Sequence, residues 1–145
     1  MKVKLSFTLL EVLLSVAIVG VLTAISIPVS RNLLIKNDVD VAAVNVVQTL
    51  RRAQILSQAS GGDTTWGLRT QVGSITLFKG TSYAARDADF DEIFDLPNSI
   101  TPSGLPEIVF AELTGYPQTT GTLTLTTSIG DVRSISINAK GTIEY

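Results

Sequence analysis

The residues with the clearest capacity for chemistry lie near the start of the chain, in Phe7-Thr-Leu-Leu-Glu11. Glu11 is the only charged side chain between Phe7 and Val29, and a carboxylate at the centre of a bilayer-spanning helix costs about 2.5 to 3.5 kcal/mol, less near its ends. A cut before Phe7 would create an α-amino group with a pKa of about 7.7 to 8.0, mostly charged at neutral pH. On a helix this amine lies on the same face as Glu11. The spacing predicts a segment that is cleaved and then assembles beside copies of itself.

The apolar run from residue 7 to residue 29 is long enough to form a membrane helix. Its 23 residues exceed the roughly 20 that a hydrocarbon core of about 30 Å requires. The leader, residues 1–6, carries two lysines, so the positive-inside rule predicts that it stays in the cytoplasm while the rest lies outside. A secretory signal peptide is the competing interpretation, with small residues at Ala24 and Ser26. We favour the anchor, because the apolar part of a signal peptide is usually only about 7 to 15 residues long.

The apolar run continues into an amphipathic helical pattern over residues 30–60. Apolar side chains recur at helical spacing along one stripe, namely Val39, Ala43, Val46, Leu50 and Ala53. Gly61-Gly62 then supplies a stop signal. The pattern predicts a single helix over residues 7–60, about 80 Å long at about 1.5 Å per residue. Gly20 and Pro28 are its predicted weak points, where it kinks or melts, because Pro28 has no N–H to donate and its ring crowds the preceding turn.

Residues 61–145 change to the period of two that is typical of strands. Turn signals at Gly73, Gly115-Tyr-Pro117, Gly130-Asp131 and Lys140-Gly141 separate the segments. The predicted strands are residues 64–72, 74–79, 107–113, 121–127, 132–138 and 142–145. The fold class is therefore α+β: a long N-terminal helix, with a membrane half and an amphipathic half, packed on a C-terminal antiparallel β domain.

The composition of residues 61–145 argues against nucleic-acid binding and catalysis. These residues contain five basic and ten acidic side chains, a formal charge of −5, whereas a nucleic-acid binder normally carries a basic stripe. The chain has no His and no Cys, and it has no recognisable nucleophile motif. We predict that it is not an enzyme, and that packing without disulfides holds an exported domain.

The acidic stretch at residues 81–96 raises the question of a metal. Asp87, Asp89 and Asp91 alternate and offer the hard oxygen ligands that calcium prefers. An EF-hand loop, however, requires Gly at the position of Glu92. A solvated acidic loop, held to the core by Phe90, Ile93 and Phe94, is the favoured prediction. No cofactor is predicted, and calcium at these aspartates is the alternative.

The N-terminal features together resemble a type IV prepilin: a basic leader, Phe-Thr-Leu-Leu-Glu from residue 7, Gly20, Pro28 and an amphipathic continuation into a β domain. The resemblance covers about residues 1–30. It implies that prepilin peptidase cuts between Ser6 and Phe7, that Phe7 becomes N-methylated, and that Glu11 is the carboxylate needed for assembly. The family usually has Gly where this chain has Ser6.

The second half of the chain, about residues 60–145, is similar to minor pseudopilins of the H type and related minor pilins. The stretches that carry this similarity are Ile108-Val-Phe110, Gly121-Thr-Leu-Thr-Leu125 and Arg133-Ser-Ile-Ser-Ile137. In those proteins the helix packs against a domain of two sheets. The C-terminal disulfide loop of many gram-negative pilins has no counterpart, because the chain lacks Cys.

The resemblance implies a structural subunit of a pilus-like extracellular filament. The precursor would lie in the cytoplasmic membrane, and its partners would be copies of itself, other pilins, prepilin peptidase and the inner-membrane assembly platform. A minor pseudopilin of a type II secretion system is the alternative within this class, and a membrane-anchored binding domain that never polymerises is the alternative outside it. Glu11 also has a simpler interpretation, because Thr8-x-x-Glu11 fits a capping box that only starts the helix.

Overall fold

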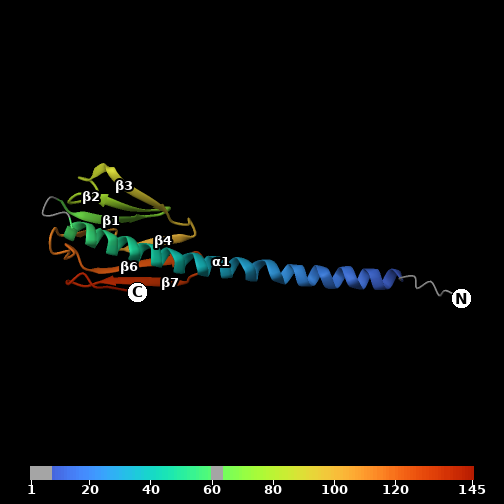
Figure 1. The fold of residues 1–145 in the computed structure, drawn as a ribbon. Helices are drawn as coiled ribbons and strands as arrows, with labels where there is room; N and C mark the ends of the chain where they lie inside the picture. The colour runs from blue at the N-terminus through green and yellow to red at the C-terminus, as the bar shows by residue number, and fades with distance from the viewer. Residues whose placement is uncertain (1–7, 60–63) are drawn as a thin grey trace. The chain divides into compact units, whose positions relative to one another are not determined.

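The computed structural model describes residues 8–59 and 64–145, and of residues 25–33 it describes the backbone but not the side chains. The chain divides into two compact units, Met1–Leu34 and Ile35–Tyr145. The first unit contains the beginning of helix α1, and the second contains the end of α1 together with strands β1 to β8 (Figure 1). The α+β class and the antiparallel sheets predicted from the sequence are confirmed.

Helix α1 runs from Leu9 to Ala59. Thr8 precedes it as the N-cap, the position where a side-chain oxygen satisfies one of the free N–H groups of the first turn. At the other end, the backbone carbonyl of Ser57 accepts a hydrogen bond from the N–H of Leu113 at 3.1 Å. Within the part of the chain that the structure describes, no helical stretch combines the length and the apolarity needed to cross a membrane.

The first sheet has the strand order β3-β2-β1-β5. Its strands are β1 (Trp66–Gln71), β2 (Ser74–Lys79), β3 (Asp87–Asp95) and β5 (Glu107–Phe110). The strands β1 and β2 form a hairpin around the predicted turn at Gly73, in which Gln71 faces Ser74. Gly73 has φ 86°, a backbone region that glycine enters without steric cost. The turn at Gly73 and the start of β5 at residue 107 are thus confirmed, while β5 ends at Phe110 and not at the predicted residue 113.

The second sheet has the order β4-β6-β7-β8. Its strands are β4 (Ile100–Gly104), β6 (Gly121–Thr127), β7 (Val132–Ile137) and β8 (Ile143–Glu144). The hairpin between β6 and β7 turns at Gly130, as predicted, with φ 90°. Leu123 and Leu125 alternate with threonines and are fully buried, so one face of this sheet is apolar.

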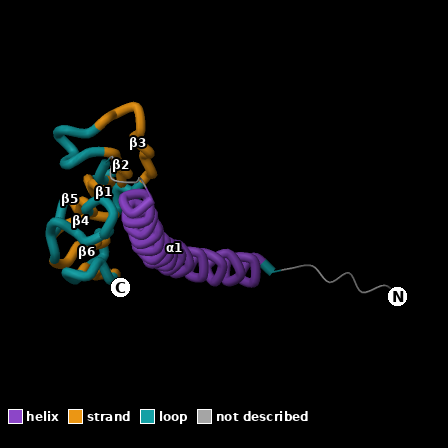
Figure 2. Tube along the Cα trace, turned by 60° about the vertical axis from the view of Figure 1, so that its left-hand side comes forward, coloured by secondary structure: helices purple, strands orange, loops and turns teal. Residues whose placement is uncertain are grey.

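The C-terminal half of α1 and both sheets enclose one core, all of it within the unit Ile35–Tyr145 (Figure 2). The predicted apolar stripe of the helix is buried: Val39, Ala43, Val46, Leu50 and Ala53 are at most 1% exposed. The sheets add side chains from seven strands, among them Leu68, Ile75, Leu77, Ile100, Ile108, Leu123, Ile135 and Ile143. Sequence periodicity therefore identified the correct face of the helix.

The acidic stretch differs from the prediction. It contains a nine-residue strand, β3, at the edge of the first sheet, and this strand is not a loop. Ile93 is 66% exposed and does not hold the stretch to the core, whereas Phe94 packs against it. Phe90 is half-exposed, and its ring meets Trp66, itself packed on the core, edge-on at 6.3 Å. Strand β4 was not predicted, because Pro102 lies within it; proline is tolerated there since β4 is an edge strand.

The pairing of β3 with β2 contains a large bulge. Leu77 pairs with Glu92 and Lys79 pairs with Asp87, so a step of two residues on β2 matches a step of five on β3. Residues 88–91 are therefore outside the regular ladder. Figure 1 shows this part of β3 arching away from its neighbour.

Candidate functional site

The first described turn of α1 is built around Thr8 and Glu11. The N–H of Glu11 donates to the Thr8 hydroxyl at 3.3 Å, which is one half of the predicted capping box. The carbonyl of Glu11 accepts a hydrogen bond from the Ser15 hydroxyl at 2.7 Å. The Glu11 side chain itself is exposed. Its backbone thus begins the helix while its carboxylate faces outward, where another group can reach it.

The side chains that surround Glu11 form an apolar surface on all sides of the helix. Within residues 8–24 Glu11 is the only charged residue. The large apolar side chains are exposed by between 52% at Val12 and 81% at Leu9: Leu9, Leu10, Val12, Leu13, Leu14, Val16, Ile18, Val19, Val21 and Leu22. Such a surface is far larger than the apolar patches of ordinary soluble monomers, which indicates an interaction surface.

The other residues predicted for processing and assembly are only partly placed. Ser6 and Phe7 lie outside the described residues, so the predicted pair between a Phe7 amine and Glu11 remains a prediction. Gly20 is inside α1. A Cβ atom at this position would have no described atom within 4 Å apart from the neighbouring backbone of the helix itself. The Thr23 hydroxyl donates to the carbonyls of Val19 and Gly20 at 2.9 and 3.0 Å. The backbone at Pro28 is helical, and its side chain lies outside the described residues.

The aspartates considered for calcium are directed to different partners. Asp91 forms an ion pair with Arg86 at 2.7 Å, and a carboxylate oxygen of Asp87 accepts the N–H of Asp89 at 3.3 Å. Among residues 8–59 and 64–145, no group of three or more His, Cys, Asp or Glu side chains is arranged to hold a metal ion. The calcium alternative gains no support from this arrangement.

An aromatic and charged cluster holds the connection between β2 and β3. The guanidinium of Arg86 lies 3.9 Å from the ring centre of Tyr83, and that ring meets Phe78 edge-on at 5.6 Å. The hydrogen bond from Arg86 to Asp91 raises the pKa of Arg86 above its ordinary value. Arg86 therefore stays charged at every physiological pH. The cluster was not predicted, because it brings together residues with no regular spacing.

Two further ion pairs connect the helix to the sheets. Arg52 of α1 binds Glu92 of β3, and Asp40 of α1 binds Arg133 of β7, each pair at 2.6 Å. Gln54 donates to the carbonyls of Gly115 and Gly141 at 3.0 and 3.3 Å. These polar side chains fasten both flanks of this part of α1 to the sheets and loops of the same unit.

A groove lies between α1 and strand β8, with a volume of about 330 Å³. We call it the α1–β8 groove; its lining residues are Arg51, Gln54, Ile55, Gly141, Thr142 and Ile143. Ile55 is 61% exposed on the helix side, and Ile143 is 8% exposed at the sheet. The groove combines an apolar surface with the positive charge of Arg51.

No protein-family model matches this chain, and no solved structure matches it.

Proposed function

We propose that the chain is a structural subunit of a type IV pilus-like filament, cleaved before Phe7 and assembled through the N-terminal part of α1. The observation that carries the proposal is the apolar surface of residues 8–24 with Glu11 as its single charge. The apolar side chains need a covering that the described residues do not provide. A bilayer before assembly and the helices of neighbouring subunits afterwards supply it. The proposed membrane segment, residues 7–29, extends beyond the described side chains at both ends.

The exposed carboxylate of Glu11 gives such an assembly its register. Apolar helices gain little hydrophobic energy by leaving lipid for one another, so packing and polar pairing decide how they associate. The amine of a cleaved Phe7 on a neighbouring subunit is the partner we propose for Glu11. A misaligned neighbour would leave the carboxylate unpaired at low dielectric, which is strongly unfavourable. One carboxylate in each helix therefore selects one stagger.

The outer unit, Ile35–Tyr145, fits the role of a domain that coats the filament. It has its own core, and ion pairs on both flanks join its sheets to the segment of α1 that belongs to the same unit. In this proposal the helix is the structural centre and the sheets form the surface. A pseudopilus of a secretion system would use the same subunit design, so the proposal concerns the class of filament subunit.

Processing at Ser6–Phe7 provides the first test. Protein isolated from the membranes and sheared filaments of the native host should have an intact mass that corresponds to a chain beginning at N-methylated Phe7. A Phe7 start without methylation would support cleavage alone. A chain that begins near Ile27 would establish a signal peptide and contradict the proposal. An uncleaved chain found only in the membrane would instead favour an anchored domain that does not polymerise.

A further inference from the structure

Two neighbouring arginines of α1 have different environments. Arg52 forms a bidentate ion pair with Glu92 of β3, with both N–O distances at 2.6 Å. Arg51 is exposed, and it lines the α1–β8 groove on the other flank. No described carboxylate forms an ion pair with Arg51. Lys140 is adjacent to Gly141 of the groove and is likewise exposed. This flank thus has two exposed cations that form no ion pair with a described carboxylate.

The opposite flank of the domain carries exposed negative charge, which complements the exposed cations beside the α1–β8 groove. Strand β3 contributes Asp87, Asp89 and Asp95, which are exposed and form no ion pair with a described cation. Two large apolar side chains, Phe90 and Ile93, are exposed between them. The bulge at residues 88–91 moves this part of the strand out of the ladder with β2. We call Asp87–Asp95 the acidic edge.

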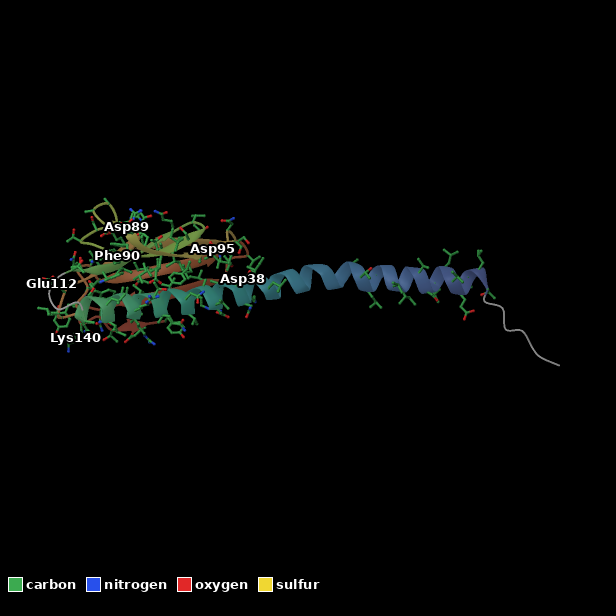
Figure 3. All side chains as sticks on the ribbon, turned by 45° about the horizontal axis from the view of Figure 1, so that its top comes forward. Asp38, Asp89, Phe90, Asp95, Glu112 and Lys140 are labelled. Carbon is green, nitrogen blue, oxygen red and sulfur yellow. The ribbon has the colours of Figure 1, made fainter. Side chains whose placement is uncertain are left out.

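The two surfaces lie on opposite sides of the outer unit. Strand β3 is one of the two edge strands of the first sheet, and β8 is one of the two edge strands of the second sheet. Figure 3 shows Asp89 and Phe90 on one side of this unit and Lys140 on the other. A single copy therefore cannot bring its own acidic edge to its own groove.

We propose that the acidic edge of one copy docks against the α1–β8 groove of the next copy, with Asp89 opposite Arg51. The occupant is a second copy because each surface supplies what the other lacks: exposed carboxylates with two apolar side chains on one, exposed cations with Ile55 on the other. Glu144 does not line the groove, so no described carboxylate of the lining opposes an acidic partner.

A contact between two different surfaces has a consequence for symmetry. When a patch on one side binds a different patch on the other side, each added copy exposes a new free patch. The result is an open chain unless the rotation closes a ring. This inference rests on the proposed filament and specifies how neighbouring outer domains touch in it. Single surface ion pairs are weak, but the anchored helices hold the domains at a high effective concentration.

Engineered cysteines test the contact directly, because the natural chain has none. The full-length chain with both Arg51→Cys and Asp89→Cys should form a ladder of covalent dimers, trimers and higher species in filaments under mild oxidation. A mixture of chains with one change each should give dimers only. Arg51→Cys with Glu112→Cys is the control, because Glu112 is also exposed but is not in the acidic edge. The control should remain monomeric.

Several results would overturn the contact. Normal filaments without a 51–89 ladder would disprove it and leave the filament proposal intact. Dimers from Arg51→Cys alone would indicate a symmetric interface, and a cross-link to a different polypeptide would indicate a different partner. If the chain is not found in filaments at all, the filament proposal fails, and this inference fails with it.

Charge reversal gives an independent readout. Arg51→Asp and Asp89→Arg, each alone, should reduce the number of filaments by about fivefold, which is the effect of losing about 1 kcal/mol at each contact. The two changes in one chain should restore the number, because the pair is re-formed with opposite signs. Arg51→Asp combined with Glu112→Arg is the control that should not restore it, because Glu112 is exposed but lies outside the acidic edge. An equal loss of filaments in Arg51→Asp, in Asp89→Arg and in the chain that carries both changes would contradict the proposed pairing.

Discussion

Arg52 on α1 and Glu92 on β3 are forty positions apart in the sequence and form two parallel hydrogen bonds of 2.6 Å. Their side chains remain 51% and 42% exposed. Planar guanidinium and carboxylate groups suit this bidentate arrangement, which fixes orientation as well as charge. The pair attaches the edge strand of the first sheet to the helix, and it fixes the flank of α1 on which β3 lies.

The exposure of this pair limits what it contributes to stability. We expect Arg52→Ala and Glu92→Ala to be coupled by only about 0.2 to 1 kcal/mol in a double-mutant cycle, because solvent screens the attraction. Urea denaturation of the outer domain measures the coupling. Arg51→Ala is the matched control and should change the free energy of unfolding by less than about 0.5 kcal/mol. A larger effect of Arg51→Ala would mean that Arg51 has an intramolecular role, against its proposed role between copies.

Replacing Glu11 separates assembly from helix capping. Glu11→Ala should leave the precursor inserted and cleaved but reduce filaments by more than about tenfold, because breaking a buried ion pair costs about 3 to 5 kcal/mol. Glu11→Gln should behave similarly, since an amide cannot form the full charge pair. Electron microscopy of sheared filaments, compared with the amount of membrane-bound chain, measures the loss.

Thr8→Ala is the control for Glu11. It removes the hydroxyl that accepts the Glu11 N–H and costs about 1 kcal/mol of helix stability without removing the carboxylate. Filaments should therefore persist in Thr8→Ala. If both variants assemble normally, Glu11 only begins the helix. Co-expression of Glu11→Ala with the natural chain should restore part of its incorporation, because the variant still offers its own amine to a neighbour.

The buried stripe of α1 should be essential to the outer domain. Leu50 is fully buried in the core that both sheets share with the helix, so Leu50→Ala should lower the free energy of unfolding by about 2 to 5 kcal/mol. A chain truncated to residues 35–145, which retains the complete core, is suitable for urea denaturation. Gln48→Ala, on the exposed face of the same helix, should change stability by less than about 0.5 kcal/mol.

Truncation to residues 64–145 extends the same argument. Removal of the helix exposes the face of both sheets that it covers, including Leu68 and Leu123, which are now fully buried. Such a small domain cannot replace that burial, so this chain should be unfolded or aggregated. Identical melting of the two truncated chains would show that the helix contributes nothing to the core.

Much of the fold could be predicted because local patterns and packing agree. The stripe from Val39 to Ala53 has helical spacing, and the strands around Gly73 and Gly130 have a period of two with glycine at the turn. Each element therefore signals its own buried face. The edge strands gave weaker signals, since β3 is mostly acidic and β4 contains Pro102. Their pairing depends on distant strands that propensity does not report.

The candidate sites also divide into residues with a local sequence signal and residues whose environment depends on the fold. Glu11 could be identified because a single carboxylate in an apolar run is conspicuous in the sequence itself. The different environments of Arg51 and Arg52 could not be predicted, because neighbouring residues on a helix differ by about 100° in direction and the flank of each strand is a property of the fold. Ion pairs such as Asp40–Arg133 depend on that arrangement too.

The bulge of β3 also affects how the protein avoids uncontrolled association. A regular edge strand presents unpaired N–H and C=O groups to which a strand from another molecule can add, which is the route to amyloid. Here the step of five residues against two disrupts the repeat, and the exposed aspartates repel a like-charged strand. This edge of the first sheet is thereby protected from adding a further strand by hydrogen bonding. In the proposed assembly, neighbouring copies would then meet through side chains at this edge and not through strand pairing.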